Sequence, residues 1–148
     1  MIRLATRYDT PRLLEMIEQY CYEAPIELLK DKQYHNKKYV EQMLFELVNG
    51  RGFILIDDEF KGMIGGIIIP NIWCPNVFEL HELFWWVKPE CRNGILGGRL
   101  WVKFDDMAQK LLNSGRVKLV HATKMSTSPN LNYEKYGYKP LNNTFFRN

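Results

Sequence analysis

Apolar residues recur along this chain with two different periods, and together these periods predict strands and helices in a regular order. Alternating or unbroken apolar runs predict strands over residues 2–7, 52–57, 63–69, 77–87, 117–122 and 141–146. Apolar spacings of three and four predict helices over residues 10–21, 39–48, 99–112 and 130–136. The order β-α-α-β-β-β-α-β-α-β describes an α/β (α+β) domain with a mixed, mostly antiparallel sheet of six or seven strands and about four helices.

The stretch from Val77 to Leu112 is the most informative part of this pattern. It combines an aromatic strand, a turn with one Pro and three Gly residues, and an amphipathic helix. Gly94, Gly97 and Gly98 leave backbone N–H groups exposed in the turn, and the positive end of the following helix points the same way. The sequence therefore predicts an anion site, with phosphate as the expected ligand, where the turn meets the helix.

Composition bounds the class of protein. Of 148 residues, 46% are hydrophobic and 25% are charged, as in soluble globular proteins, and the length suits a single domain over residues 1–148. No apolar run is long enough to cross a bilayer and no signal-peptide pattern is present, so we expect a cytoplasmic protein without membrane contact. Cys21, Cys74 and Cys91 form no metal-ligand pattern and are expected to be reduced thiols, so no metal is expected.

The turn and its flanks resemble the acetyl-CoA-binding motif of the GNAT superfamily of N-acetyltransferases. Residues 92–100 read Arg-Asn-Gly-Ile-Leu-Gly-Gly-Arg-Leu, against the family pattern Arg-x-x-Gly-x-Gly/Ala-x-x-Leu. Arg92, Gly97 and Leu100 match, while Ile95 stands where the first Gly of the pattern is expected. The preceding Phe-Trp-Trp-Val-x-Pro-Glu segment is most similar to small GNAT proteins of tailed bacteriophages.

This resemblance implies a GNAT-like fold and acetyl-CoA as a co-substrate. Arg92 and the turn from Asn93 to Gly98 would cradle the pyrophosphate. The implied cofactor-binding residues are Trp85, Trp86, Val87, Arg92, Asn93, Gly94, Ile95, Leu96, Gly97, Gly98 and Asn130. For the tryptophans, packing in the core is the alternative interpretation.

A second resemblance lies near the C-terminus. Residues 132–138, Asn-Tyr-Glu-Lys-Tyr-Gly-Tyr, are similar to the Leu-Tyr-Glu-Lys-x-Gly-Phe segment of many GNAT enzymes. In that family the tyrosine is often a general acid that protonates the departing CoA thiolate, so the resemblance assigns this role to Tyr133. Packing beneath the last strand is the alternative. Ser126 replaces the Asn that usually lies one or two turns earlier, and Asn130 is a candidate substitute for it.

Three side chains on the strand over residues 77–87 could accept a proton from an attacking amine: Glu79, His81 and Glu82. Strict alternation along the strand would place Glu79 and His81 on one face and Glu82 on the other. The face of Glu79 and His81 would also carry Leu83, Trp85 and Val87. His81 has an ordinary pKa suited to proton removal near neutral pH, and it lies where several GNAT enzymes have their base. A satisfied polar residue or a salt bridge is the alternative for each candidate.

These observations lead to three hypotheses about function. The first is acetyl transfer to a primary amine of a protein, a nucleic-acid-linked group or a small molecule, by direct attack with a strand base and a tyrosine acid. The second is a nucleic-acid-modifying protein on the same scaffold, which a net charge of +3 permits but no dense Lys/Arg stripe supports. The third is a non-catalytic protein that binds a host factor.

Three further features leave choices open. In GNAT folds the region between the first two helices borders the acceptor site, which here is the loop or broken helix over residues 22–36. The mixed-charge stretch from Leu29 to Lys38 overlaps this region and is expected to be a solvated surface. The sequence names no partner for His35 or His121, so both are expected to be structural. Nothing in the pattern decides between a monomer and a homodimer.

Overall fold

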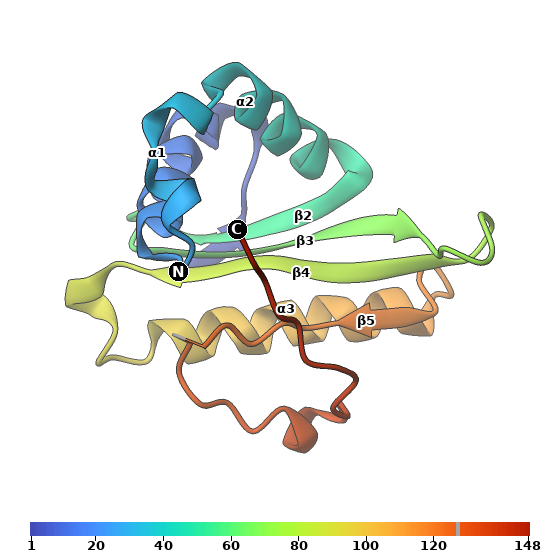
Figure 1. The fold of residues 1–148 in the computed structure, drawn as a ribbon. Coiled ribbons are helices and arrows are strands. Elements are labelled where there is room, and N and C mark those ends of the chain that lie inside the picture. The colour runs from blue at the N-terminus through green and yellow to red at the C-terminus, as the bar shows by residue number, and fades with distance from the viewer. Residues whose placement is uncertain (127) are drawn as a thin grey trace.

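A computed structural model describes residues 1–126 and 128–148. In this part of the chain, five strands form one sheet, in the spatial order β1 (Ile2–Leu4), β2 (Gly52–Asp57), β3 (Gly62–Pro70), β4 (Phe78–Val87) and β5 (Leu119–His121). The first four strands are antiparallel, and β5 runs parallel to β4. As Figure 1 shows, α1 (Thr10–Glu23) and α2 (Lys37–Glu46) cover one face of the sheet, and α3 (Leu96–Asn113) covers the other.

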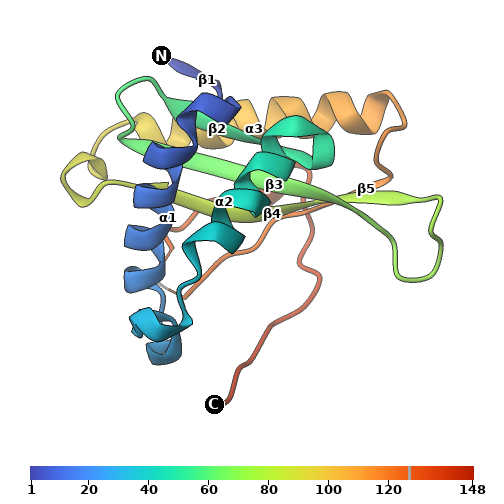
Figure 2. The same ribbon diagram turned by 90° about the horizontal axis from the view of Figure 1, so that it is seen from above.

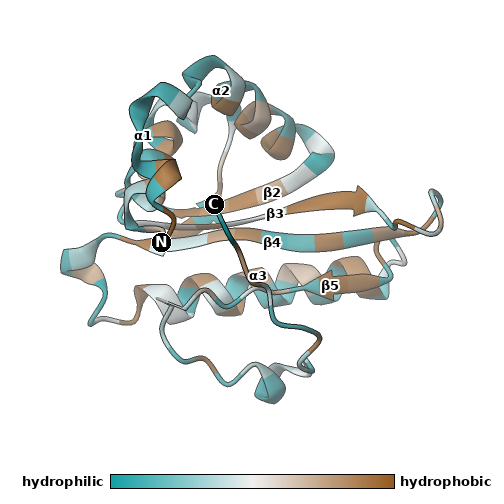
Figure 3. Cartoon of the chain, viewed as in Figure 1, coloured by the Kyte–Doolittle hydropathy of each residue, from teal (hydrophilic) through white to brown (hydrophobic). Residues whose placement is uncertain are grey.

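The two faces of the sheet bury two separate apolar clusters, because side chains alternate along each strand. On β2, Ile54 and Ile56 pack in the cluster under α1 and α2, while Phe53 and Leu55 pack in the cluster over α3. Because β2 has helices on both of its faces, it is apolar and buried from Phe53 to Ile56. In Figure 3, β2 and much of β3 are brown, β4 alternates between teal and brown, and the outer sides of α1 and α2 are largely teal.

Helix α3 forms as the apolar spacing predicts, although it begins at Leu96 and therefore before the predicted start at residue 99. Leu100, Trp101, Phe104 and Ala108 are buried on one side of this helix. Each large apolar side chain buried there contributes about 1.5–3 kcal/mol, so this face fixes both the helix and the turn before it. In the described part of the chain, no helix combines the length and the apolar character that a bilayer crossing requires.

The predicted six or seven strands and four helices are wrong, because the C-terminal part of the chain forms less regular structure. The described residues contain five strands and three α-helices. The predicted helix over residues 130–136 is a single 3-10 turn, Tyr133–Tyr136, since Gly137 ends it in the left-handed conformation (φ 86°). The predicted strand over residues 141–146 is absent: this segment is exposed and extends away from the sheet, where no strand can pair with it (Figure 2).

The pairing of β3 with β4 contains a β-bulge. The register shifts between Gly65 and Gly66, and Leu83 is the extra residue in β4. A Cβ on Gly65 would lie 2.6 Å from the ring of Phe84. A Cβ on Gly66 would lie 2.9 Å from the side chain of Leu80. The two glycines therefore allow β4 and its large side chains to approach β3 closely at the bulge.

Because of this bulge, the predicted division of the β4 side chains between the two faces is wrong. Glu79 and His81 do share a face, the one covered by α1 and α2, since His81 lies opposite Ile67 of that cluster. Trp85 and Val87 pack instead in the cluster on the α3 side. One inserted residue reverses the alternation for everything that follows it.

A nearly buried carboxylate anchors β1 to the start of α1. Asp9 accepts hydrogen bonds from Nη1 and Nη2 of Arg3 at 2.8 and 2.9 Å, and from the backbone N–H of Thr6 at 2.8 Å. The hydrogen bonds from Arg3 are the largest cause that lowers the pKa of the Asp9 carboxyl to about 2. A pKa below that of the unfolded chain means that the ionised carboxyl stabilises the folded state.

We expect acid to remove this contribution. Because the pKa of Asp9 is depressed, the stabilisation is complete above about pH 5 and is lost as the pH falls towards about 2. The shift corresponds to about 2 kcal/mol of unfolding free energy. Urea denaturation at about pH 5 and about pH 2.5 should show this loss in the wild type but not in Asp9→Asn.

The matched control for this prediction is Asp58→Asn. Asp58 contacts the same arginine, at 3.1 Å from its Nε, but its side chain is 46% exposed. The control should therefore lose stability in acid as the wild type does. An equal acid loss in Asp9→Asn would contradict the assignment to Asp9.

Candidate functional site

The candidate site lies where β4 and β5 separate. Their parallel pairing is short, because β5 spans Leu119–His121 and not the predicted residues 117–122. The pairs are Glu79 with Leu119, Leu80 with Val120 and His81 with His121. Beyond them β4 continues to Val87, and within the described chain only β3 pairs with it there. One edge of the β4 backbone is therefore open after His81, and an extended ligand could hydrogen-bond to it.

Glu82 is the first residue of β4 beyond this pairing. Its Oε2 accepts a hydrogen bond from the backbone N–H of Thr123 at 3.1 Å, so the carboxylate stands in the gap between the strands. Burial raises the pKa of the Glu82 carboxyl to about 7, and the Thr123 N–H opposes this rise. Burial first and the Glu82 charge second raise the pKa of Tyr20 and of Tyr133. Glu82 thus lies within electrostatic range of both α1, which carries Tyr20, and the turn that carries Tyr133.

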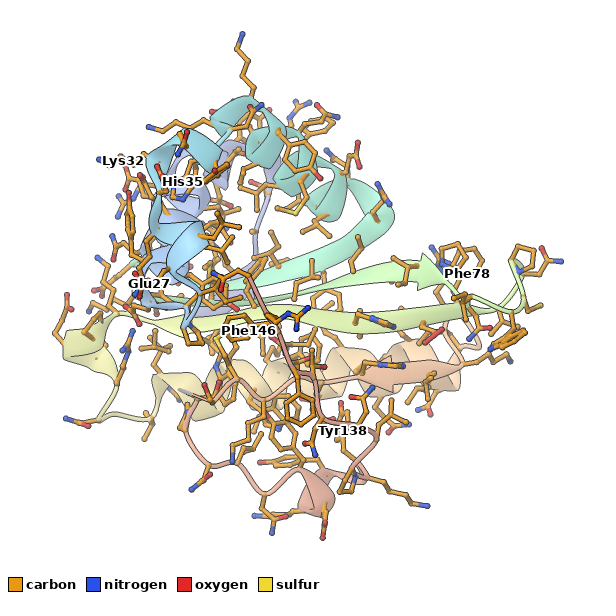
Figure 4. The ribbon with its side chains drawn as sticks, viewed as in Figure 1. Glu27, Lys32, His35, Phe78, Tyr138 and Phe146 are labelled. Atoms are coloured by element: carbon orange, nitrogen blue, oxygen red, sulfur yellow. The ribbon has the colours of Figure 1, made fainter. Side chains whose placement is uncertain are left out.

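Tyr133 approaches the gap from the α3 side of the sheet. It begins the turn Tyr133–Tyr136, whose N-terminus is capped by the Asn132 side chain. Its ring packs edge-on against Trp101, with the ring centroids 5.2 Å apart. Tyr138, labelled below the sheet in Figure 4, packs beside it at 6.3 Å. Burial raises the pKa of the Tyr133 phenol, and a tyrosine phenol carries its proton near neutral pH in any case, so the hydroxyl can donate a hydrogen bond or a proton there.

The two tryptophans at the end of β4 lie on opposite faces of the sheet. Trp85 packs on the α3 side, with its ring centroid 5.8 Å from that of Trp101. Trp101 is buried, and its indole N–H has no acceptor among the residues described. This unpaired hydrogen-bond donor belongs to a ring that packs against Tyr133. Trp86 belongs to the core under α1 and α2, where its indole N–H donates to Oε1 of Glu23 at 3.1 Å. Only Trp85 therefore shares a face with Tyr133.

The turn between β4 and α3 presents unpaired backbone donors. Arg99 donates the first helical hydrogen bond of α3, so in the described chain the N–H groups of Leu96, Gly97 and Gly98 have no acceptor. A Cβ on Gly97 would lie 3.6 Å from the nearest side chain, and one on Gly98 would meet nothing within 4 Å. The rest of the turn is exposed and consists of Asn93, Gly94 and Ile95. No neighbouring atom of the described residues would clash with a Cβ at position 97 or 98. The space that a side chain would fill is therefore open, and a ligand can approach the backbone there.

Arg92 is held by intramolecular contacts at the start of this turn. Its Nε donates to the backbone oxygen of Val87 at 2.8 Å, and its Nη2 forms an ion pair with Oε2 of Glu23. Because Glu23 also accepts from Trp86, this network ties the end of α1 to the end of β4. With 43% of its side chain exposed, Arg92 can in addition meet an anion at the turn.

A hollow of about 630 Å³ lies beside the turn, on the side of β1 and β2. Its charged lining consists of Arg99 and Lys103 from α3, with Asp57 and Asp106. Met1 also lines the hollow, and its terminal ammonium lies 3.9 Å from Oδ1 of Asp57. Neither Glu82 nor Tyr133 lines the hollow. The hollow therefore adjoins the turn and is separate from the gap between β4 and β5.

Glu79, His81 and His121 form a polar cluster at the end of the β4–β5 pairing. The register brings His121 beside His81, and their rings stack with centroids 4.0 Å apart. Nε2 of each ring approaches Oε1 of Glu79, at 3.2 Å for His81 and 3.0 Å for His121. Asn71 donates to Oε2 at 2.8 Å, and this hydrogen bond is the main cause that lowers the pKa of the Glu79 carboxyl. Sequence reasoning missed His121, and the only available signal was a histidine in each of two strands expected to be parallel neighbours.

The other predicted residues make surface contacts. Asn130 is exposed, and its Oδ1 accepts a hydrogen bond from Nζ of Lys124 at 2.5 Å. The connection between α1 and α2 contains two short 3-10 turns on the helical side above the sheet, where Figure 4 labels Glu27, Lys32 and His35. The first two of these side chains are exposed, so this connection is free to contact another molecule.

No family model and no curated protein sequence matches this chain. Solved structures match almost all of it. A predicted acetyltransferase from Clostridium acetobutylicum, solved with acetyl-CoA, is 14% identical with a TM-score of 0.70, over 100% of this chain and 95% of that one. A GCN5-related N-acetyltransferase from Ralstonia eutropha is 16% identical with a TM-score of 0.69, over 99% and 97%. A possible acetyltransferase from Clostridium difficile is 13% identical with a TM-score of 0.68, over 99% and 95%. The chain therefore has the fold of these proteins, as the sequence resemblance implied.

Proposed function

We propose that this protein is an acetyl-CoA-dependent N-acetyltransferase that transfers an acetyl group to a primary amine. The observation that carries the proposal is the gap between β4 and β5, with Glu82 in it and Tyr133 beside it, which leads along β4 to a turn of unpaired N–H groups. The three similar structures are named as acetyltransferases, which supports the same assignment. The Phe-Trp-Trp-Val-x-Pro-Glu segment over residues 84–90 is our reason for proposing the bacteriophage type.

Acetyl-CoA would bind along the open edge of β4. The N–H groups of Leu96, Gly97 and Gly98 would donate to the pyrophosphate at the positive end of α3. The pantetheine arm carries amide groups of its own, so the edge of β4 from Glu82 to Trp86 that no strand of the described chain pairs can hydrogen-bond to it. With the pyrophosphate at the turn and the pantetheine arm along β4, the thioester of acetyl-CoA would lie near Glu82 and Tyr133.

Acetyl transfer then needs one proton acceptor and one proton donor. The amine arrives as ammonium, loses a proton to Glu82, and its nitrogen attacks the thioester carbonyl. As the C–N bond forms and the C–S bond breaks, the CoA sulfur takes a proton from Tyr133. The nitrogen loses its second proton as the amide forms, and this proton restores the phenol.

Position favours Glu82 as the base over the other two strand candidates. Glu82 lies beyond the β4–β5 pairing, in the gap that the thioester would enter. Glu79 and His81 lie within the paired segment and are hydrogen-bonded to each other, and Asn71 occupies the second oxygen of Glu79. The amine would enter past the connection over residues 22–36, which the GNAT resemblance places at the acceptor site.

A carboxylate at position 97 should weaken cofactor binding. Gly97→Asp places a negative charge among the N–H donors, so the affinity for acetyl-CoA should fall by about tenfold or more, which corresponds to about 1.4 kcal/mol. The side chain has room in the folded protein, since the nearest atom to its Cβ is at 3.6 Å. Isothermal titration calorimetry with acetyl-CoA measures the effect.

The control for this prediction introduces the same charge elsewhere on α3. Gln109→Asp lies on an exposed part of the helix, about 18 Å further along its axis, and should bind acetyl-CoA as the wild type does. Unchanged affinity in a folded Gly97→Asp protein would reject the turn as the pyrophosphate site.

The transfer reaction itself is tested with acceptors of different classes. The protein and acetyl-CoA are incubated with a peptide that has a free N-terminus, with a lysine peptide blocked at its N-terminus, and with a polyamine. Mass spectrometry should show one added acetyl group on at least one acceptor, with free CoA formed in equal amount. Binding of acetyl-CoA without acetylation of any acceptor would contradict the proposed reaction for these amine classes.

A further inference from the structure

The cluster of Glu79, His81 and His121 has no role in the proposed acetyl transfer, and its possible ligand atoms lie close together. One carboxylate oxygen and two imidazole nitrogens lie within 4.8 Å of one another. The Nε2 atoms of His81 and His121 are 3.2 and 3.0 Å from Oε1 of Glu79. Two ligand atoms bound to the same tetrahedral Zn²⁺ lie about 3.3 Å apart, so these separations are close to those of a zinc site.

The sheet holds the three side chains in this arrangement. Glu79 and His81 are two residues apart on β4 and share a face, and the parallel register places His121 beside His81. The stacked rings are inclined by only 18° to each other. Glu79 is 9% exposed, while the histidines are 30% and 27% exposed. The backbone therefore fixes the three side chains, and the two histidine rings are partly exposed to solvent.

The hydrogen bonding of His121 and Glu79 is also consistent with a bound ion. Nε2 of His121 is buried and makes no hydrogen bond of adequate geometry within the described chain, although the Glu79 oxygen is close. Buried polar atoms are normally satisfied, so this nitrogen lacks a ligand. Asn71 holds the other oxygen of Glu79, which is how an outer hydrogen bond orients a carboxylate that binds a metal.

We propose that Glu79, His81 and His121 bind a divalent transition metal ion, with Zn²⁺ as the best fit. Two imidazoles and a carboxylate are a donor set of zinc sites that have three protein ligands and one open position. The ion joins β4 to β5 at their last pair, and so fixes the point from which the gap beside Glu82 opens. The cysteine spacing, on which the sequence expectation of no metal depends, does not bear on this cluster.

Metal binding is measured directly on the metal-depleted full-length protein. Calorimetry with ZnCl₂ should show one Zn²⁺ per chain. Co²⁺ should give visible absorption bands of a four- or five-coordinate site without thiolate bands in the near ultraviolet, because the ligands are nitrogen and oxygen. Each of His81→Gln, His121→Gln and Glu79→Gln should lower the Zn²⁺ affinity by about tenfold or more, and Asn71→Ala should lower it by about 10- to 100-fold.

Two control variants test the alternative donors. His35→Gln removes the remaining histidine and Cys74→Ser removes a partly buried thiol, and both should bind Zn²⁺ as the wild type does. Absence of Zn²⁺ binding by the wild type, unchanged binding by the folded His121→Gln protein, or thiolate bands with Co²⁺ would overturn the proposal. If a ligand variant does not fold, the wild-type Co²⁺ spectrum still decides. Since no acetyl-CoA is present, these results are independent of the proposed acetyl transfer.

Discussion

Replacement of Glu82 by glutamine should remove most of the turnover and leave the binding of acetyl-CoA intact. A general base contributes typically 10²- to 10⁴-fold, so kcat/KM should fall by about 10²-fold or more. The amide has the same shape, and its oxygen can still accept the hydrogen bond from Thr123, so the gap between β4 and β5 should keep its form. What the amide cannot do is take a proton from the amine. Steady-state kinetics with the best acceptor and calorimetry with acetyl-CoA measure the two quantities separately.

The control for Glu82→Gln is Glu59→Gln. Glu59 lies in the exposed turn between β2 and β3, far from the gap, so its variant should keep wild-type kinetics. Full turnover by Glu82→Gln would show that the base lies elsewhere, with His81 and Glu79 as the next candidates. A loss of acetyl-CoA affinity in the same variant would instead assign Glu82 to cofactor binding.

The second large effect is expected at Tyr133. Tyr133→Phe keeps the ring and its edge-on contact with Trp101 but removes the hydroxyl, so the melting temperature should hardly change. If the phenol delivers the proton to the CoA sulfur, turnover should fall by about 10- to 10³-fold. Tyr133→Ala removes the ring as well and should in addition cost about 3 kcal/mol of stability. Measuring kcat and melting temperature for both variants separates the chemical role from packing.

Tyr136 provides a matched control on the same turn. Its ring also packs edge-on against Trp101, with the centroids 5.7 Å apart, and the proposed reaction gives it no role. Tyr136→Phe should therefore retain both turnover and stability. Near-normal kcat in Tyr133→Phe together with an unstable Tyr133→Ala is the result expected of packing alone, and it would remove Tyr133 from the reaction.

Local periodicity was sufficient for the elements that form the centre of the molecule. The hairpin of β2 and β3, the long strand β4 and the helix α3 all lie where the apolar pattern predicts them, with ends displaced by a few residues. The pattern failed for residues 141–146, because apolar residues can pair as a strand only if a neighbouring strand supplies hydrogen bonds. None lies beside this exposed segment in the structure.

The sequence by itself determined the order of elements up to β5, the glycine turn before α3, and the two segments whose resemblance points to acetyl transfer. Only the tertiary structure decided which side chains meet. The extra residue Leu83 reversed the faces of β4 beyond the bulge, and the register of β5 brought His121 to Glu79. The physical reason is that hydrophobic periodicity records how each element faces the core, whereas contacts between elements depend on register and bulges, which arise only when the strands pair.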